Sequence, residues 1–173
     1  MAKARNLDIT EEIYYEVIRQ KTASLIASCC AVGAASTGAD KETVQKMREF
    51  GLNVGMAFQI KDDLFDYGTN EIGKPLGIDI KEKKMTLPLI YALQKASASD
   101  RRRIKRIVKS NKQTNKKVQE VIDYVKASGG IDYAKGVMQE YYEKSRNLLM
   151  EFPDSKYRQS LLDLVQFTIE RSK

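Results

Sequence analysis

Helical periodicity runs through almost the whole chain, and few residues interrupt it. Only 3 prolines and 10 glycines occur among 173 residues. Apolar residues recur at the three- and four-residue spacing of an α-helix over long segments, without a hairpin-type turn or a sequence repeat. Because proline and glycine are the strongest breakers of regular structure, this pattern predicts an all-α chain.

Capping residues set the limits of the predicted helices. Asp8 or Thr10 is expected to cap the first helix, Asp40 the second and Thr86 the one after a polar loop at 68–85. The length fits a single helical domain over the whole chain, or part of a larger one. We expect helices at about 10–36, 40–68, 86–96, 98–110, 114–128, 131–151 and 154–171.

Charge and composition exclude several classes of function. The chain carries 30 Lys and Arg against 23 Asp and Glu, a net charge of +7. Such a surplus suits nucleic acid, anionic lipid or a phosphate-bearing small molecule. Histidine is absent, which excludes histidine-based acid–base catalysis, Ser–His and Cys–His nucleophiles, and histidine-ligated zinc.

The cysteines and the first residues of the chain indicate the cellular compartment in which the protein works. Cys29 and Cys30 are the only cysteines. We expect them to be small buried residues, since their spacing fits neither a metal site nor a disulfide framework. Acidic residues precede any apolar stretch, so no secretory signal is visible, and no segment is long and apolar enough to span a bilayer. These features predict a cytoplasmic protein.

A basic segment, "SDRRRIKRIVKSNKQTNKK" at 99–117, holds much of the positive charge. Ile104, Ile107 and Val108 form an inward stripe, which leaves the basic side chains outside. This face is either an ordinary solvated surface or a patch for nucleic acid or membrane. It lacks the interleaved aromatic residues of single-strand binders, so we expect no nucleic-acid partner.

Three acids stand close together near the predicted end of the second helix, in "GMAFQIKDDLFDYG". Acids are disfavoured in the last turn of a helix, and adjacent or i,i+4 acids repel each other. Asp63 lies on the flank of the face that Asp62 defines. Along that face the residues are small and apolar at first, then polar, and acidic at the end of the helix. Its members are Gly51, Gly55, Phe58, Gln59 and Asp66.

The glycines on this face leave two interpretations open. They remove side chains where a long apolar ligand comes close, or they mark an ordinary helix–helix contact that ends in a solvated acidic turn.

A lysine interrupts the apolar stripe predicted for the first helix. On a regular helical wheel, the residues within about 60° of Lys21 are Tyr14, Ile18, Leu25, Ser28 and Val32. An ammonium group on an inward face is costly unless it is paired. It either forms a buried salt bridge with the acids or lines a cavity that holds a polyanion with a divalent cation.

The loop after the acids supports the second option. It places Lys74, Lys81, Lys83 and Lys84 just beyond the carboxylates, with Asp79 among them. Mg²⁺ binds through one or two carboxylates, waters and substrate phosphate oxygens. Lysines supply compact positive charges for the remaining phosphate oxygens.

The order of these motifs resembles the trans-prenyl diphosphate synthases, the polyprenyl synthetase family. The matching residues are "KT" at 21–22, "FQIKDDLFD" at 58–66, "GK" at 73–74, Asp79 and "KMTLP" at 84–88. The resemblance implies an all-helical isoprenoid-synthase fold. It also implies Mg²⁺-dependent condensation of an allylic diphosphate with isopentenyl diphosphate.

The resemblance also implies roles for individual residues. Asp62 would be the principal magnesium ligand, with Asp63 and Asp66 holding metal-bound water or neighbouring lysines. The allylic diphosphate would be held by Lys21, Lys74 and Lys84.

Other residues would face the hydrocarbon part of the substrate. Thr22 and Gln59 would point side-chain oxygens toward the allylic carbon, and Phe58 would line the hydrocarbon path. Lys83 departs from the family pattern, because it stands where a glycine is usual before the lysine.

The chain has one "DDxxD" cluster where the family has two, so the resemblance covers roughly the second half of the family pattern. It implies a homodimer and peripheral membrane contact for product release. The alternative is a non-catalytic helical partner of a full-length synthase, which would pack through the small residues "ASCCAVGAAS" at 27–36.

Overall fold

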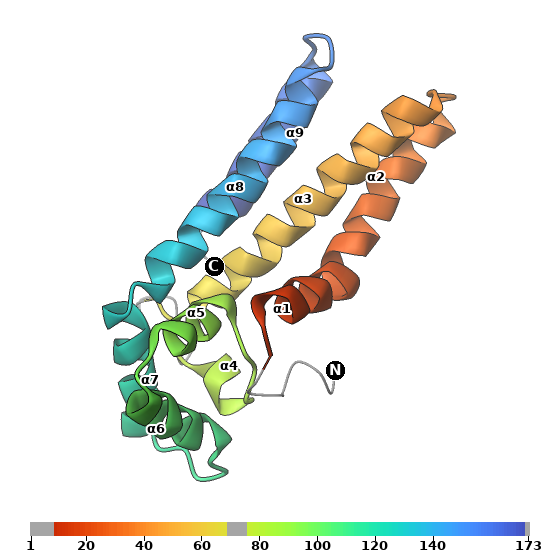
Figure 1. Cartoon of the computed structure of the whole chain (residues 1–173). Helices are drawn as coiled ribbons and strands as arrows, with labels where there is room; N and C mark the ends of the chain where they lie inside the picture. Colours follow the sequence, from red (N-terminus) through yellow and green to blue (C-terminus); the bar gives the residue numbers. More distant parts are fainter. Residues whose placement is uncertain (1–8, 69–75, 172–173) are drawn as a thin grey trace. The chain divides into compact units, whose positions relative to one another are not determined.

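The computed structural model describes residues 9–68 and 76–171, and the regular structure in these ranges is helical throughout (Figure 1). The prediction of an all-α chain is therefore confirmed. The limits of the predicted helices hold to within a few residues, but a further short helix at 78–81 lies within the stretch predicted as a polar loop. The elements are α1 (Glu11–Ile18), η2 (Arg19–Ala23), α2 (Ser24–Ser36), α3 (Lys41–Phe65), α4 (Ile78–Lys81), α5 (Leu87–Lys95), α6 (Ala98–Lys109), α7 (Asn115–Ala127), α8 (Gly130–Met150) and α9 (Lys156–Glu170).

The described chain divides into two compact units. The first unit contains 9–14, 62–68 and 76–135, and the second contains 15–61 and 136–171. The three division points among the described residues all fall inside helices, since α1, α3 and α8 each contribute to both units.

The second unit is built from long helices. Its apolar cluster joins α3 to α8 and α9 through Phe50, Val54, Leu149 and Val165. Asp40 caps α3, as predicted, because its carboxylate accepts a hydrogen bond from the Thr43 N–H at 2.7 Å.

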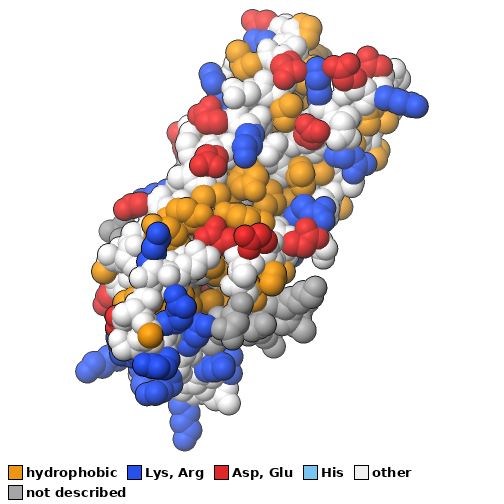
Figure 2. All heavy atoms as spheres, viewed as in Figure 1, with side chains coloured by type: hydrophobic (Ala, Val, Ile, Leu, Met, Phe, Trp, Pro, Cys, Tyr) orange, Lys and Arg blue, Asp and Glu red, His pale blue; other side chains and the backbone are white. Residues whose placement is uncertain are grey.

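The first unit packs shorter helices around its own core. Side chains with at most 1% exposure come from α4 to α7, and they include Ile80, Leu87, Ile104, Val108, Val121 and Val125. The inward stripe predicted for the basic segment is confirmed, since Ile104, Ile107 and Val108 are all buried. Figure 2 shows Lys and Arg side chains gathered over this part of the chain.

The long first helix contains a π-helical segment, η2, which the sequence analysis did not predict. Buried positions in α1 follow the usual four-residue step, from Tyr14 to Ile18. The next buried residue is Ala23, five positions on, and the step then returns to four through Ala27 and Ala31. A π turn closes its hydrogen bonds over five residues, so it shifts the downstream buried face by one residue.

This shift corrects the inward face predicted around Lys21. Leu25 and Val32 are each 67% exposed, and Lys21 is exposed as well. The regular wheel was wrong beyond Ile18 because it assumed a constant 100° per residue. The buried salt bridge proposed for Lys21 is therefore not what the structure shows.

Two smaller predictions also need correction. Cys29 is exposed and Cys30 is half-buried, because the one-residue shift turns the neighbouring alanines inward instead. Thr86 stands at the N-cap position of α5, but its side chain makes no capping hydrogen bond. Its hydroxyl pairs instead with the buried Tyr67 hydroxyl.

Among the described residues, none of the helices is both long enough and apolar enough to cross a membrane.

Candidate functional site

The acidic turn at the end of α3 is held by backbone amides from the loop that follows. Asp66 lies just beyond the last residue of α3 and is buried, with 7% exposure. Its Oδ1 accepts a hydrogen bond from the Ile78 N–H at 2.8 Å, and its Oδ2 accepts one from the Asp79 N–H at 3.1 Å. Asp66 therefore fixes the first turn of α4 against the end of α3.

Burial and a nearby like charge act together on Asp66. Desolvation raises the pKa of its carboxyl, and the Asp79 carboxylate raises it further, while the backbone N–H bonds oppose both effects.

Asp63 is held by a tyrosine from the first helix. The Tyr14 hydroxyl donates a hydrogen bond to Asp63 Oδ2 at 2.8 Å. Tyr14 was not selected as a site residue from the sequence. A phenol at a buried helix position is most often a core residue, and no local pattern links it to an acid 49 positions away.

Lys84 is held by an acid of α4 and by the acid that follows the helix. Its Nζ lies 2.9 Å from Asp79 Oδ1 and 2.7 Å from Glu82 Oε2. These partners raise the pKa of the Lys84 ammonium, so it is cationic at neutral pH. Asp66 binds the backbone of Asp79, and Asp79 binds Lys84, so one continuous set of contacts links the acidic turn to this lysine.

The turn between α4 and Lys84 places Lys83 in a conformation that favours glycine. The Lys83 N–H donates to the Ile80 carbonyl at 3.0 Å, and the Lys84 N–H donates to the Asp79 carbonyl at 2.8 Å. This pair of bonds defines a Schellman motif, in which the residue after the C-cap adopts the left-handed conformation. Lys83 has a φ of 60°, a value that glycine adopts at lower cost.

The structure chooses between the two interpretations of the α3 glycines. An ideal Cβ at Gly55 would lie 2.5 Å from Ala23 Cα, and one at Gly51 would lie 2.8 Å from the Ile26 carbonyl oxygen. The neighbour at these glycines is therefore a helix, η2 followed by α2, and not an open channel for a ligand.

The predicted Lys-Thr pair lies in the π-helical segment. Lys21 and Thr22 are the third and fourth residues of η2. Such segments are rare and occur frequently at functional sites, because they displace side chains from the regular helical register. This irregularity is invisible in a periodicity analysis, since the sequence there reads as ordinary helix.

The remaining predicted residues are distributed as follows. On α3, Gln59 is buried with 6% exposure, whereas Phe58 and Asp62 are half-buried. Lys74 lies outside the described residues. Lys21, Thr22, Phe58 and Gln59 belong to the second unit, and the three aspartates and Lys84 belong to the first.

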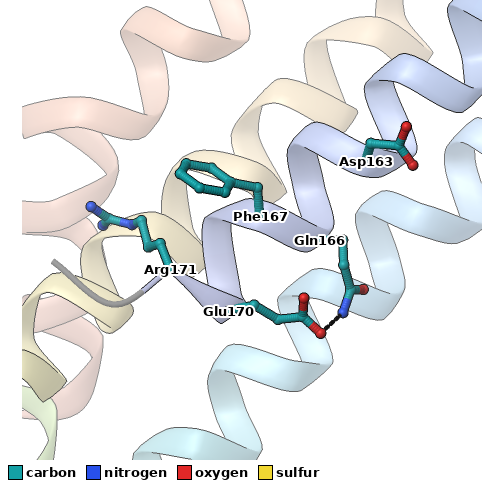
Figure 3. A pocket seen from close by; sticks show the side chains of 5 residues that line it. All are labelled: Asp163, Gln166, Phe167, Glu170 and Arg171. Atoms are coloured by element: carbon teal, nitrogen blue, oxygen red, sulfur yellow. Dashed lines mark hydrogen bonds between the residues drawn. The ribbon is translucent and has the colours of Figure 1, made fainter.

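An open pocket of about 440 Å³ lies along the last turns of α9. Figure 3 shows the side chains that line it, which are Asp163, Gln166, Phe167, Glu170 and Arg171. None of them was predicted from the sequence. The pocket reaches a predicted residue through Arg171, whose guanidinium carbon lies 4.2 Å from the centre of the Phe58 ring.

The acidic turn fits a magnesium ion only if other ligands complete its coordination. In the described part of the chain, no three acidic or thiol side chains converge on a point where a metal could bind. Both oxygens of Asp66 accept backbone N–H groups, and one oxygen of Asp63 accepts a phenol. The donors are hard oxygens, as Mg²⁺ requires, and Mg²⁺ normally takes one or two carboxylates and completes its octahedron with water and phosphate oxygens.

Comparison with known proteins matches this chain to a family. A family model described as polyprenyl synthetase matches residues 1–125. The short chain isoprenyl diphosphate synthase of Methanothermobacter thermautotrophicus is 36% identical over 173 residues, which cover 99% of this chain and 53% of that protein. The chain spans about half the length of the curated relatives it matches.

Solved structures share the fold. The decaprenyl diphosphate synthase from Rhodobacter capsulatus has a TM-score of 0.91 at 35% identity, covering 99% of this chain and 54% of that one. A polyprenyl synthase from Caulobacter crescentus, solved with calcium and isoprenyl diphosphate, has a TM-score of 0.89 at 32% identity, covering 98% and 52%. The fold is thus about half of an isoprenoid-synthase fold.

Proposed function

The chain belongs to the polyprenyl synthetase family, and from that premise we propose that it supplies the half of a prenyltransferase that binds an allylic diphosphate with Mg²⁺. The complete reaction would condense that substrate with isopentenyl diphosphate to give a longer polyprenyl diphosphate. The observation that carries this proposal is the continuous set of contacts from the acidic turn through α4 to Lys84.

The charges of the proposed site suit a diphosphate. We propose Asp62 as the magnesium ligand, because both carboxylate oxygens of Asp66 already accept hydrogen bonds from backbone amides. Lys21, Lys74 and Lys84 would hold the phosphate oxygens that the metal does not. Bound Mg²⁺ would stabilise the negative charge of the departing diphosphate.

Polar oxygens would act on the hydrocarbon end of the substrate. Gln59 and Thr22 would turn their side-chain oxygens toward the allylic carbon as positive charge develops there, a case of preorganised electrostatic stabilisation. Phe58 would line the hydrocarbon path. The chain has no histidine, and none is needed, because the released diphosphate can accept the proton lost after the carbon–carbon bond forms.

The proposal extends to partners and location. Leu25 and Val32 lie seven residues apart, on one face of α2, and both are exposed. We propose that a homodimer contact forms through this face. We propose a cytoplasmic location, as the sequence features predict, and peripheral membrane contact at product release, because the hydrocarbon part of the product is apolar.

The experiment that tests this proposal measures thermal unfolding with geranyl diphosphate, with and without MgCl₂. The ligand should raise the melting temperature of the wild-type chain only when Mg²⁺ is present, since a ligand that binds only the folded state stabilises it. Asp62→Ala should remove most of the increase, whereas Glu49→Ala, an exposed acid on the same helix, should keep it. Equal increases in wild type and Asp62→Ala would contradict the proposal.

A further inference from the structure

Two tyrosine hydroxyls of the first unit donate hydrogen bonds to carboxylates that are distant in sequence. Tyr14 Oη lies 2.8 Å from Asp63 Oδ2, and Tyr133 Oη lies 2.6 Å from Glu11 Oε2. Only Asp63 belongs to the acidic turn. The molecule therefore contains two contacts of the same chemistry, one inside the proposed site and one outside it.

The ring of Tyr14 is held firmly. Tyr14 is 3% exposed, and its backbone N–H donates to the Thr10 carbonyl at 3.0 Å in the first turn of α1. A tyrosine side chain has only two rotatable bonds, and burial fixes both. The position of the phenol oxygen is thus set by packing, and the carboxylate of Asp63 is oriented to meet it.

The contact limits how the Asp63 carboxylate can turn. A hydrogen bond from a hydroxyl to an ionised carboxylate is stronger than one between neutral groups. It engages Oδ2 and directs Oδ1 into one orientation. It also offsets part of the repulsion between Asp63 and its neighbours Asp62 and Asp66, which carry the same charge.

We propose that Tyr14 is a positioning residue for the metal–diphosphate site and acts through its hydroxyl on the Asp63 carboxylate. This inference rests on the proposed function, and it further takes Asp63 to hold water bound to the magnesium ion, which is one of the two roles that the family resemblance implies for it. Groups that hydrogen-bond to the direct ligands of a metal commonly account for 10- to 100-fold in metal affinity. Tyr14 acts one step further out, through a carboxylate that holds metal-bound water, so we expect an effect at the lower end of this range. Tyr14 therefore contributes to Mg²⁺ affinity without touching the ion or the substrate.

The test compares Tyr14→Phe with Tyr133→Phe, the matched control. Each variant loses one phenol-to-carboxylate hydrogen bond of the same unit and keeps its ring. Mg²⁺ would be titrated at saturating geranyl diphosphate while the melting temperature is followed, and Mn²⁺ binding would be followed by electron paramagnetic resonance. Tyr14→Phe should raise the half-saturating concentration of either ion about tenfold, and Tyr133→Phe should leave it within about twofold.

A second variant separates positioning from folding. In an Asp63→Asn background the phenol has no carboxylate to orient, so adding Tyr14→Phe should cause no further loss of Mg²⁺ affinity. Without ligand, the two tyrosine variants should have similar melting temperatures. If the Tyr14 hydroxyl were merely structural, Tyr14→Phe would lower the melting temperature and leave the affinity for Mg²⁺ unchanged.

The outcomes distinguish this inference from the function on which it rests. If the wild-type chain shows no Mg²⁺-dependent response to geranyl diphosphate, the proposed function fails, and the inference fails with it. If the wild type responds and Tyr14→Phe responds at the same Mg²⁺ concentration, the inference alone is overturned. An equal loss of affinity in Tyr133→Phe would overturn it as well.

Discussion

At the scale of single residues, the three aspartates of the acidic turn are held in different ways although the sequence makes them look alike. Asp66 is buried on two backbone N–H groups, and Asp63 receives the Tyr14 hydroxyl. Asp62, the proposed metal ligand, is half-buried on the last turn of α3. Asp66 thus holds the loop, the Tyr14 hydroxyl orients Asp63, and Asp62 is proposed to bind the ion.

Lys83 supplies the prediction that belongs to this scale. Replacing Lys83 by glycine should stabilise the chain by about 0.5–1 kcal/mol. The left-handed conformation costs a non-glycine residue about 1–2 kcal/mol, and the greater freedom of glycine in the unfolded chain offsets part of this gain. Chemical denaturation of wild type and variant measures the difference.

Lys83→Ala is the control for this substitution. It removes the contact between Lys83 Nζ and Asn111 Oδ1, as glycine does, but it keeps the Cβ that strains the turn. We therefore expect Lys83→Ala to be no more stable than wild type. A stabilised Lys83→Ala would mean that loss of the lysine charge, and not relief of backbone strain, explains the effect.

At the scale of elements, the start of α3 depends on the ionisation of its cap. The backbone Thr43 N–H lowers the pKa of the Asp40 carboxyl below its ordinary value of 3.8. The folded state thus holds the proton less tightly than the unfolded state. The stability that Asp40 contributes should be complete above about pH 4 and should be lost as pH falls through the lowered pKa.

Unfolding measured from pH 2 to 7 checks this prediction in three proteins. Wild type should be more stable than Asp40→Ala at neutral pH, and the difference should shrink in acid. Asp40→Asn keeps a capping oxygen without a titrating group, so its advantage over Asp40→Ala should stay constant with pH. If that advantage also shrinks in acid, ionisation of Asp40 is not the cause.

Helix packing predicts that alanine substitutions at two helical glycines change the stability of the chain in opposite directions. Gly55→Ala should destabilise by about 1–3 kcal/mol, because the new Cβ would meet the backbone of Ala23. Gly136→Ala, in α8, should stabilise by about 1 kcal/mol, since no other described atom lies within 4 Å of its ideal Cβ. Denaturant midpoints of the two variants give the comparison.

Comparing these two variants cancels the effect of alanine on the conformational freedom of the unfolded backbone. Both substitutions reduce the freedom of the unfolded chain to the same extent, so a difference in sign isolates the close approach of η2 to α3. If both variants are stabilised, the helices can separate at Gly55 at little cost.

At the scale of the whole molecule, the chain contains about half of what its relatives contain. It covers 53% of the Methanothermobacter relative and 54% of the Rhodobacter structure. The site that we propose on this chain would bind one diphosphate with its metal. A second substrate and the other aspartate-rich motif of the family pattern require residues beyond these.

The prediction at this scale concerns catalysis. With labelled isopentenyl diphosphate, an allylic primer and Mg²⁺, this chain alone should not elongate the primer. A fusion that places the first half of the Methanothermobacter relative before Met1 should elongate it, and the same fusion with Asp62→Ala should not. Turnover by the chain alone would show that the other motif is dispensable and that our account of the metal site is wrong.

The sequence alone was sufficient for the fold class, the limits of the longer helices and the family. These follow from local properties, namely helical periodicity, capping residues such as Asp40, and the motif "FQIKDDLFD" read in order with its neighbours. The buried stripe of the basic segment was also predicted correctly, because an amphipathic helix shows its buried face in its own period.

Only the tertiary structure decided the contacts that depend on distant parts of the chain. The π turn moved Lys21, Leu25 and Val32 off the predicted inward face. One extra residue in a helical turn leaves no mark in the sequence pattern, but it rotates the side chains of all later residues in that helix. The bond from Tyr14 to Asp63 joins residues 49 positions apart, and no local pattern encodes such a pair. Local preferences of the chain therefore determine its helices, and packing determines which side chains meet.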